Sequence, residues 1–138
     1  MSKVPGRLHA AGAVLFILCG IAHSIGQYSP DAHSAEIAKR IRTFTVPGTP
    51  FNYWNVMQVW GALYGAMTVL FGALLLAVQR ASGGEPRVVR ATSLIAAVAA
   101  FVQFACCIIY QTPPPVFFMI PAGIRFFLAA RWPVERRA

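Results

Sequence analysis

The chain has 138 residues, of which 57% are hydrophobic and 12% are charged. A soluble domain carries about 25% charged residues, and a chain this short cannot bury so much apolar surface in a globular core, so the composition excludes an ordinary soluble protein. The net charge of +8 would suggest a nucleic-acid partner in a soluble protein, but here the basic residues flank apolar runs, as in membrane proteins, and we expect no nucleic acid.

Four apolar runs predict four membrane-spanning helices. The second and third, Val56 to Val78 and Ala91 to Tyr110, contain no charge and reach the length of about 17–25 residues that crosses the hydrocarbon core. The first, Leu8 to Ile25, has the basic start of a signal peptide, but we expect it to remain as a helix. The fourth, Val116 to Ala130, reaches spanning length when it begins at Pro114. The predicted spans are about 8–26, 54–79, 88–110 and 114–131, within one domain of residues 1–138.

The basic residues predict the orientation. Nine of the 12 lie at the N-terminus, in the second connection and at the C-terminal end, and the other three lie in the first connection. The two groups are Lys3, Arg7, Arg80, Arg87, Arg90, Arg125, Arg131, Arg136 and Arg137, and Lys39, Arg40 and Arg42. Because basic residues concentrate on the cytoplasmic side, we predict a multi-pass membrane protein with both termini in the cytoplasm. Arg outnumbers Lys ten to two and Ala is abundant, which hints at a bacterial source and hence at the bacterial inner membrane.

The connection between the first two spans predicts a short amphipathic helix over about residues 30–44. Ile37, Ile41 and Phe44 recur at helical spacing and form one apolar face, which suits a helix that lies flat on the outer membrane surface. We expect this helix to cover the outer end of the bundle as a lid. Residues 45–50 then turn the chain into the second span.

Stripes of small and polar residues mark the helix faces that point inward, because lipid gives no reason to bury such residues elsewhere. Three spans each carry such a stripe at steps of three or four. The stripes are His9, Gly12, Phe16, Cys19, His23 and Gly26; Trp54, Gln58, Gly61, Gly65, Thr68 and Gly72; and Ser93, Ala96, Ala100, Gln103, Cys107 and Tyr110. The predicted fold is therefore an all-α, four-helix transmembrane bundle.

Polar and aromatic residues of these stripes gather in the outer half of the bundle. His23 is the leading candidate, because an ionisable side chain that faces a bundle interior suggests a function. The alternative is a neutral imidazole that is hydrogen-bonded to Tyr110 or Gln58 for packing. The candidate ligand-binding residues are His23, Trp54, Asn55, Gln58, Gln103 and Tyr110.

Two alternatives involve a cofactor. Cys19 and His23 share a helix face, so with Cys106 or Cys107 they could hold a soft metal. His9 and His23 have about the spacing of di-haem helices, although bis-His haem would need partner histidines from a second copy. Neither pattern carries a specific spacing signature, and the sequence predicts no metal ligand and no cofactor.

Other features of the spans are structural. They contain no carboxylate, so carboxylate-based acid-base chemistry lacks its usual groups, and no residue is assigned as catalytic. Gly61-x-x-x-Gly65 permits close helix approach, which we expect inside the bundle. Arg125 can extend to the cytoplasmic interface.

Three short motifs add a family resemblance. They are Ala22-His23-x-x-Gly26 at the end of the first span, Tyr53-Trp54 before the second, and Tyr110-Gln111-Thr112-Pro113-Pro114 before the last. With these motifs the chain resembles an uncharacterised family of small bacterial four-span membrane proteins. Asn55 stands where that family has Asp, which argues against an acid-base role there, and Trp60-Gly61-Ala62-Leu63 replaces Gly-Phe-Gly-Leu. The resemblance covers most of the chain and implies the four-span fold, but no function.

Three hypotheses of function follow. The first is an accessory protein that binds a lipophilic small molecule, or docks to a larger membrane complex, through the outer half. The second is an enzyme that acts on a lipid or quinone-like substrate with His23 as acid-base. The third is a subunit that carries haem or metal. The expected partners are membrane lipid and, for docking, a larger complex or further copies of the chain.

Overall fold

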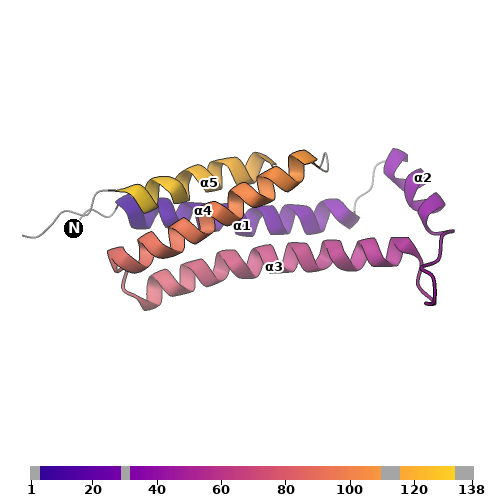
Figure 1. Cartoon of the computed structure of the whole chain (residues 1–138), viewed down its shortest axis with the longest axis horizontal. Helices are drawn as coiled ribbons and strands as arrows, with labels where there is room; N and C mark the ends of the chain where they lie inside the picture. The colour runs from indigo at the N-terminus through magenta and orange to yellow at the C-terminus, as the bar shows by residue number, and fades with distance from the viewer. Residues whose placement is uncertain (1–3, 29–31, 110–115, 133–138) are drawn as a thin grey trace, which may run out of the picture.

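The computed structural model describes residues 4–28, 32–109 and 116–132 (Figure 1). These ranges form five α-helices and no strand, which confirms the all-helical prediction. The helices are α1 (Val4–Tyr28), α2 (Ala32–Ile41), α3 (Tyr53–Ala81), α4 (Pro86–Ile109) and α5 (Val116–Arg131). Three of them, α1, α3 and α4, are long and apolar enough to cross a membrane.

The long helices pack around α1. Helix α1 runs along α3 and along α5, and α4 packs mainly on α5. Helices α3 and α4 are consecutive in the chain but touch little, and Figure 1 shows them diverging from the turn at 82–85. We call the end of the bundle with this turn the turn end, and the opposite end, beyond which α2 lies, the α2 end.

Glycines allow α1 and α3 to approach closely. A Cβ atom on Gly20 would lie 2.6 Å from the Gly65 carbonyl oxygen, and one on Gly72 would lie 2.7 Å from the Ala13 carbonyl oxygen. Real Cβ atoms essentially never come that near, so only glycine fits at these crossing points. Gly65 of the predicted Gly61-x-x-x-Gly65 motif therefore serves contact inside the bundle.

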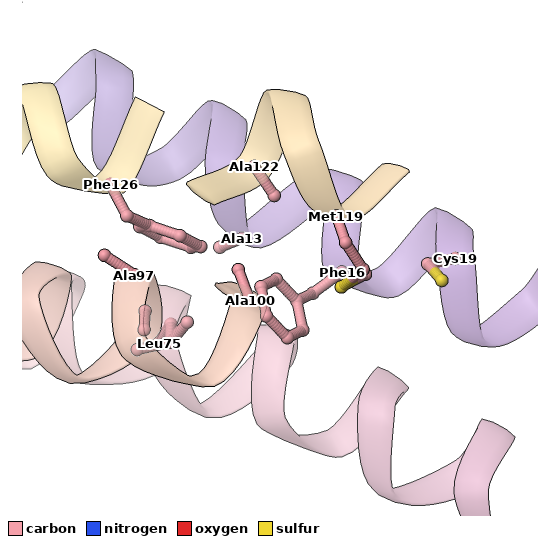
Figure 2. Close-up of a cluster of buried hydrophobic side chains, with 10 residues drawn as sticks. Ala13, Phe16, Cys19, Leu75, Ala97, Ala100, Met119, Ala122 and Phe126 are labelled. Atoms are coloured by element: carbon pink, nitrogen blue, oxygen red, sulfur yellow. The ribbon is translucent and has the colours of Figure 1, made fainter. Parts of the chain in front are cut away.

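Large side chains surrounded by alanines form the core (Figure 2). Phe16 lies in the middle, with ring centroids 5.4 Å from Phe71 and 5.7 Å from Phe126. Around them lie Ala13, Cys19, Leu75, Ala97, Ala100, Met119 and Ala122. Most described members of the predicted inward stripes are buried or half-buried, which confirms those faces. The prediction that Gly26 faces inward is wrong, because this residue is exposed and no atom lies within 4 Å of where a Cβ would stand.

The two connections described in full are tight turns. At the turn end Gly83 and Gly84 have φ values of 61° and 74°, a region that suits glycine at a helix C-terminus. Beyond the α2 end, residues 44–53 form a hairpin turn: the Val46 N–H donates to the Phe51 carbonyl at 2.8 Å, and Gly48 has a φ of 77°. The predicted turn at 45–50 is therefore confirmed.

Helix α2 differs from the predicted helix over 30–44. It ends at Ile41, because the backbone of Phe44 belongs to the hairpin, where its carbonyl accepts from the Tyr53 N–H at 3.0 Å. Ile37 and Phe44 are 44% and 63% exposed, whereas Ala38 is buried. Among the described helices α2 contacts only α3. The expectation that this helix covers the outer end of the bundle is therefore wrong for α1 and α4, which α2 does not contact.

Candidate functional site

His9, near the turn end, is a buried polar group with two hydrogen-bond partners. Its Nδ1 lies 2.7 Å from the Ser93 hydroxyl and its Nε2 lies 3.3 Å from the Leu75 carbonyl oxygen. A carbonyl can only accept, so Nε2 carries the hydrogen and Nδ1 accepts from Ser93. The ring also meets Phe126 edge-on, with centroids 5.5 Å apart. His9 thus joins four helices, α1, α3, α4 and α5.

This arrangement bears on the haem hypothesis. Both ring nitrogens of His9 are used within the bundle, and the side chain is fully buried. An axial haem ligand needs a nitrogen free to face the iron. His9 therefore cannot pair with His23 to hold two haems in this packing. Its hydrogen bonds and ring contact instead connect the helices of the bundle.

The second histidine lies toward the α2 end. The His23 ring meets the Tyr64 ring edge-on, with centroids 4.7 Å apart. Tyr64 is half-buried on α3 and was not among the predicted site residues. It stands three residues after Gly61 and four before Thr68, so the helical spacing of the stripe already pointed to it.

The contact between α1 and α4 shows which residues lie at the same depth. The two helices run in the same direction, and His9 lies beside Ser93. Ten residues further along each helix stand Cys19 of α1 and Gln103 of α4, which therefore lie at about the same depth as each other. One further turn leads to His23 on α1 and Cys107 on α4. Gln103 therefore lies about one helical turn, roughly 6 Å, closer to the turn end than His23 does.

Two polar atoms at this depth are buried without a hydrogen-bond partner in the described part of the chain. They are Nε2 of His23 and Oε1 of Gln103. A buried polar group without a partner costs several kcal/mol, roughly 2–7 depending on the reference state. Native proteins therefore satisfy such groups with protein, water or ligand. The outer site is defined here as His23, Tyr64 and Gln103 with the neighbouring thiols of Cys19 and Cys107.

The thiols do not complete a metal site in the described ranges. Cys19 and Cys107 are buried and close enough to interact electrostatically, whereas Cys106 is exposed. No three His, Cys, Asp or Glu side chains of the described residues converge as metal ligands. The described residues therefore do not form the metal site that Cys19, His23 and one of the adjacent cysteines, Cys106 or Cys107, could have provided.

The remaining predicted site residues lie farther out. The Arg42 guanidinium carbon stands 5.1 Å from the centre of the Trp54 ring, so that indole is covered by the residue that follows α2. Asn55 is exposed, and its backbone N–H donates to the Asn52 side chain at 2.9 Å, which caps α3. Gln58 is half-buried on α3, between these residues and the level of His23. Tyr110 lies outside the described residues.

Arg125 takes no part in the outer site. Its Nη1 donates to the Pro121 carbonyl at 3.2 Å, so the guanidinium turns back along α5 instead of reaching the C-terminal end of the helix. The expected extension toward the cytoplasmic interface is not what the structure shows. The acceptor is the carbonyl of Pro121 itself, one helical turn before Arg125.

Comparison with known proteins adds no relative. No protein-family model, curated protein or solved structure matches this chain. The resemblance carried by the Ala-His-x-x-Gly and Tyr-Trp motifs therefore stays a prediction. What is established is the class: an all-helical protein with three helices able to cross a membrane and an uncharged polar cluster among them.

Proposed function

We propose that the chain is a four-span protein of the bacterial inner membrane, with the turn end in the cytoplasm and the α2 end outside. Basic residues on both sides of the turn, Arg80 and Arg87, support this orientation. Helix α5 supports the fourth span, because Phe117 and Phe127 are exposed while its other face is buried in the bundle. Over residues 116–124 this helix is apolar all round, which is typical of a membrane interior.

We further propose that this protein binds a lipophilic small molecule in its outer half. The observation that carries the proposal is the pair of buried atoms, His23 Nε2 and Gln103 Oε1, for which the described chain supplies no partner. In a membrane, water is scarce and a polar side chain facing the bundle interior is expensive to keep. A ligand with polar atoms in its head and apolar carbon in its tail would satisfy both atoms and stay within the bilayer.

The test is to identify what the protein retains. The full chain is purified in mild detergent and its bound lipids are identified by mass spectrometry, with the variant His23→Leu in parallel. Ser24→Ala is the matched control, because the Ser24 hydroxyl already donates to the Gly20 carbonyl of its own helix at 2.9 Å. We expect one lipophilic species to be enriched with the wild type and the control but lost with His23→Leu. Equal lipid profiles for all three proteins would refute the proposal.

A second function, docking to a larger membrane complex, is favoured by one separate observation. Beyond the α2 end, Ile37, Phe44 and Phe51 are all exposed and lie near the cations Lys39 and Arg42. A surface of mixed apolar and basic character is suited to a partner or to lipid head groups. Chemical cross-linking in membranes from the native host, followed by the variant Phe44→Ser, would distinguish docking from lipid contact.

A further inference from the structure

We infer that the ligand of the outer site is an uncharged lipid whose head carries hydroxyl groups, with Gln103 accepting from a hydroxyl and His23 bonding a second oxygen. This inference rests on the proposed function and names the chemical class of the ligand. It follows from three properties of the site: its charge, the bonding capacity of its two buried atoms, and their separation.

The charge of the surroundings excludes an ionised head group. Residues 8–28, 53–79, 91–109 and 116–124 contain no Asp, Glu, Lys or Arg, so these segments bring no charged side chain to the outer site. Arg125 is nearer to the turn end and donates to Pro121. A buried charge without a partner of opposite sign is far more costly than a buried neutral group. A fatty acid or a phosphate would therefore be rejected.

The bonding capacity of Gln103 selects an uncharged hydrogen-bond donor, such as a hydroxyl. The buried atom without a partner in the described chain is its Oε1, and a carbonyl oxygen can only accept a hydrogen bond. Ketone and ester oxygens of a ligand can also only accept, so they leave Oε1 unsatisfied. Nε2 of His23 is less selective, because an imidazole nitrogen donates or accepts according to its tautomer. The pair thus favours a hydroxyl at Gln103 and any oxygen at His23.

The separation of the two residues limits the shape of the head. Gln103 and His23 lie about one helical turn apart along the bundle, roughly 6 Å. A ligand that reaches both residues therefore needs two oxygens on different carbons, because the distance between the two helices adds to this offset along the bundle. A hydroquinone, with oxygens at opposite corners of a ring, has this form, and so does a glycerolipid with a free hydroxyl.

Two matched ligand pairs test the inference on the full-length wild-type protein in detergent. The first pair is a short-chain ubiquinol and its quinone, kept apart under argon with and without reductant. The second is dioctanoylglycerol and dioctanoyl phosphatidic acid. Each pair shares its tail and differs in whether the head offers an uncharged hydroxyl. Binding is measured by the shift in thermal unfolding and by protection of Cys19 and Cys107 from a thiol reagent.

We expect the hydroxyl member of one pair to bind at least tenfold tighter than its counterpart, and the pair that responds identifies the source. The variant Gln103→Leu should abolish this preference. Gln79→Leu should retain it, because the Gln79 amide lies at the turn end and donates to the Gly6 carbonyl at 2.9 Å. The comparison of ligands on the wild type needs no variant, so it stands even where a variant fails to fold.

Three results would overturn the inference. They are equal or tighter binding of the quinone or phosphatidic acid, a hydroxyl preference that survives Gln103→Leu, and no binding of any of the four probes. Each of these leaves the proposed function to be judged by the lipid that co-purifies with the wild type. A protein that retains a carbonyl-only or anionic lipid through His23 would keep the proposed function and lose this inference.

Discussion

Because α1 and α3 are in close contact, one methyl group added between them should markedly lower the free energy of unfolding. In Gly72→Ala the new Cβ would stand 2.7 Å from the Ala13 carbonyl oxygen and 2.8 Å from Cγ1 of Ile17, whereas ordinary contact begins at 3.4 Å. The two helices must therefore separate by roughly 0.7 Å, and a gap of 0.5–1 Å forfeits about a quarter to a half of each dispersion contact. Overpacking of this kind costs about 1–3 kcal/mol.

Gly26→Ala is the matched control on α1, because nothing lies within 4 Å of its Cβ position. Alanine is the better helix former by up to about 1 kcal/mol, so the control should be neutral or slightly stabilised. Reversible unfolding in mixed lipid and detergent micelles gives the free energy of unfolding of each variant. We expect Gly72→Ala to lie about 1–3 kcal/mol below Gly26→Ala. Two variants equal within about 0.5 kcal/mol would mean that the helices are not in contact at this point.

Three further predictions concern the hydrogen bond between His9 and Ser93, the membrane topology and the insertion of α5. A double-mutant cycle with His9→Leu and Ser93→Ala should give a coupling energy of about 0.6–1.7 kcal/mol, and a value of zero would contradict their hydrogen bond. Glu85→Cys should react with an impermeant thiol reagent only from the cytoplasm and Thr49→Cys only from outside, and the reverse pattern would refute the proposed orientation. Arg125→Leu should increase membrane insertion of α5, since a central Arg costs about 2.5–3.5 kcal/mol on insertion scales, and unchanged insertion in a glycosylation-mapping assay would count against a fourth span.

The inward faces were largely predictable, because small and polar residues have no reason to recur at helical spacing on a lipid-facing surface. His9, Phe16 and Ser93 were all expected inside and all are fully buried. Their partners were not predictable from spacing, which cannot distinguish the satisfied His9 from His23. That difference depends on Ser93 and Leu75, which are brought beside His9 only by helix packing.

The candidate site was predicted in part. His23 and Gln103 lie half-buried on inward faces of α1 and α4, whereas Trp54 and Asn55 lie farther out, at the start of α3. Trp54 lies in the first turn of α3 and contacts Arg42, since α3 begins at Tyr53, before the apolar run from Val56 to Val78. Tyr64 was overlooked although its spacing fits the stripe.

The sequence by itself determined the helices, the membrane character and the absence of charge around the outer site, because these follow from local composition and from the length that a bilayer demands. Only the tertiary structure decided which helices are neighbours. Helix α4 lies on α5 and away from α3, although a tight turn joins α3 to α4. The physical reason is shape: Gly65 and Gly72 fit α3 to the backbone of α1, while the alanines of α4 accommodate Met119 and Phe126 of α5.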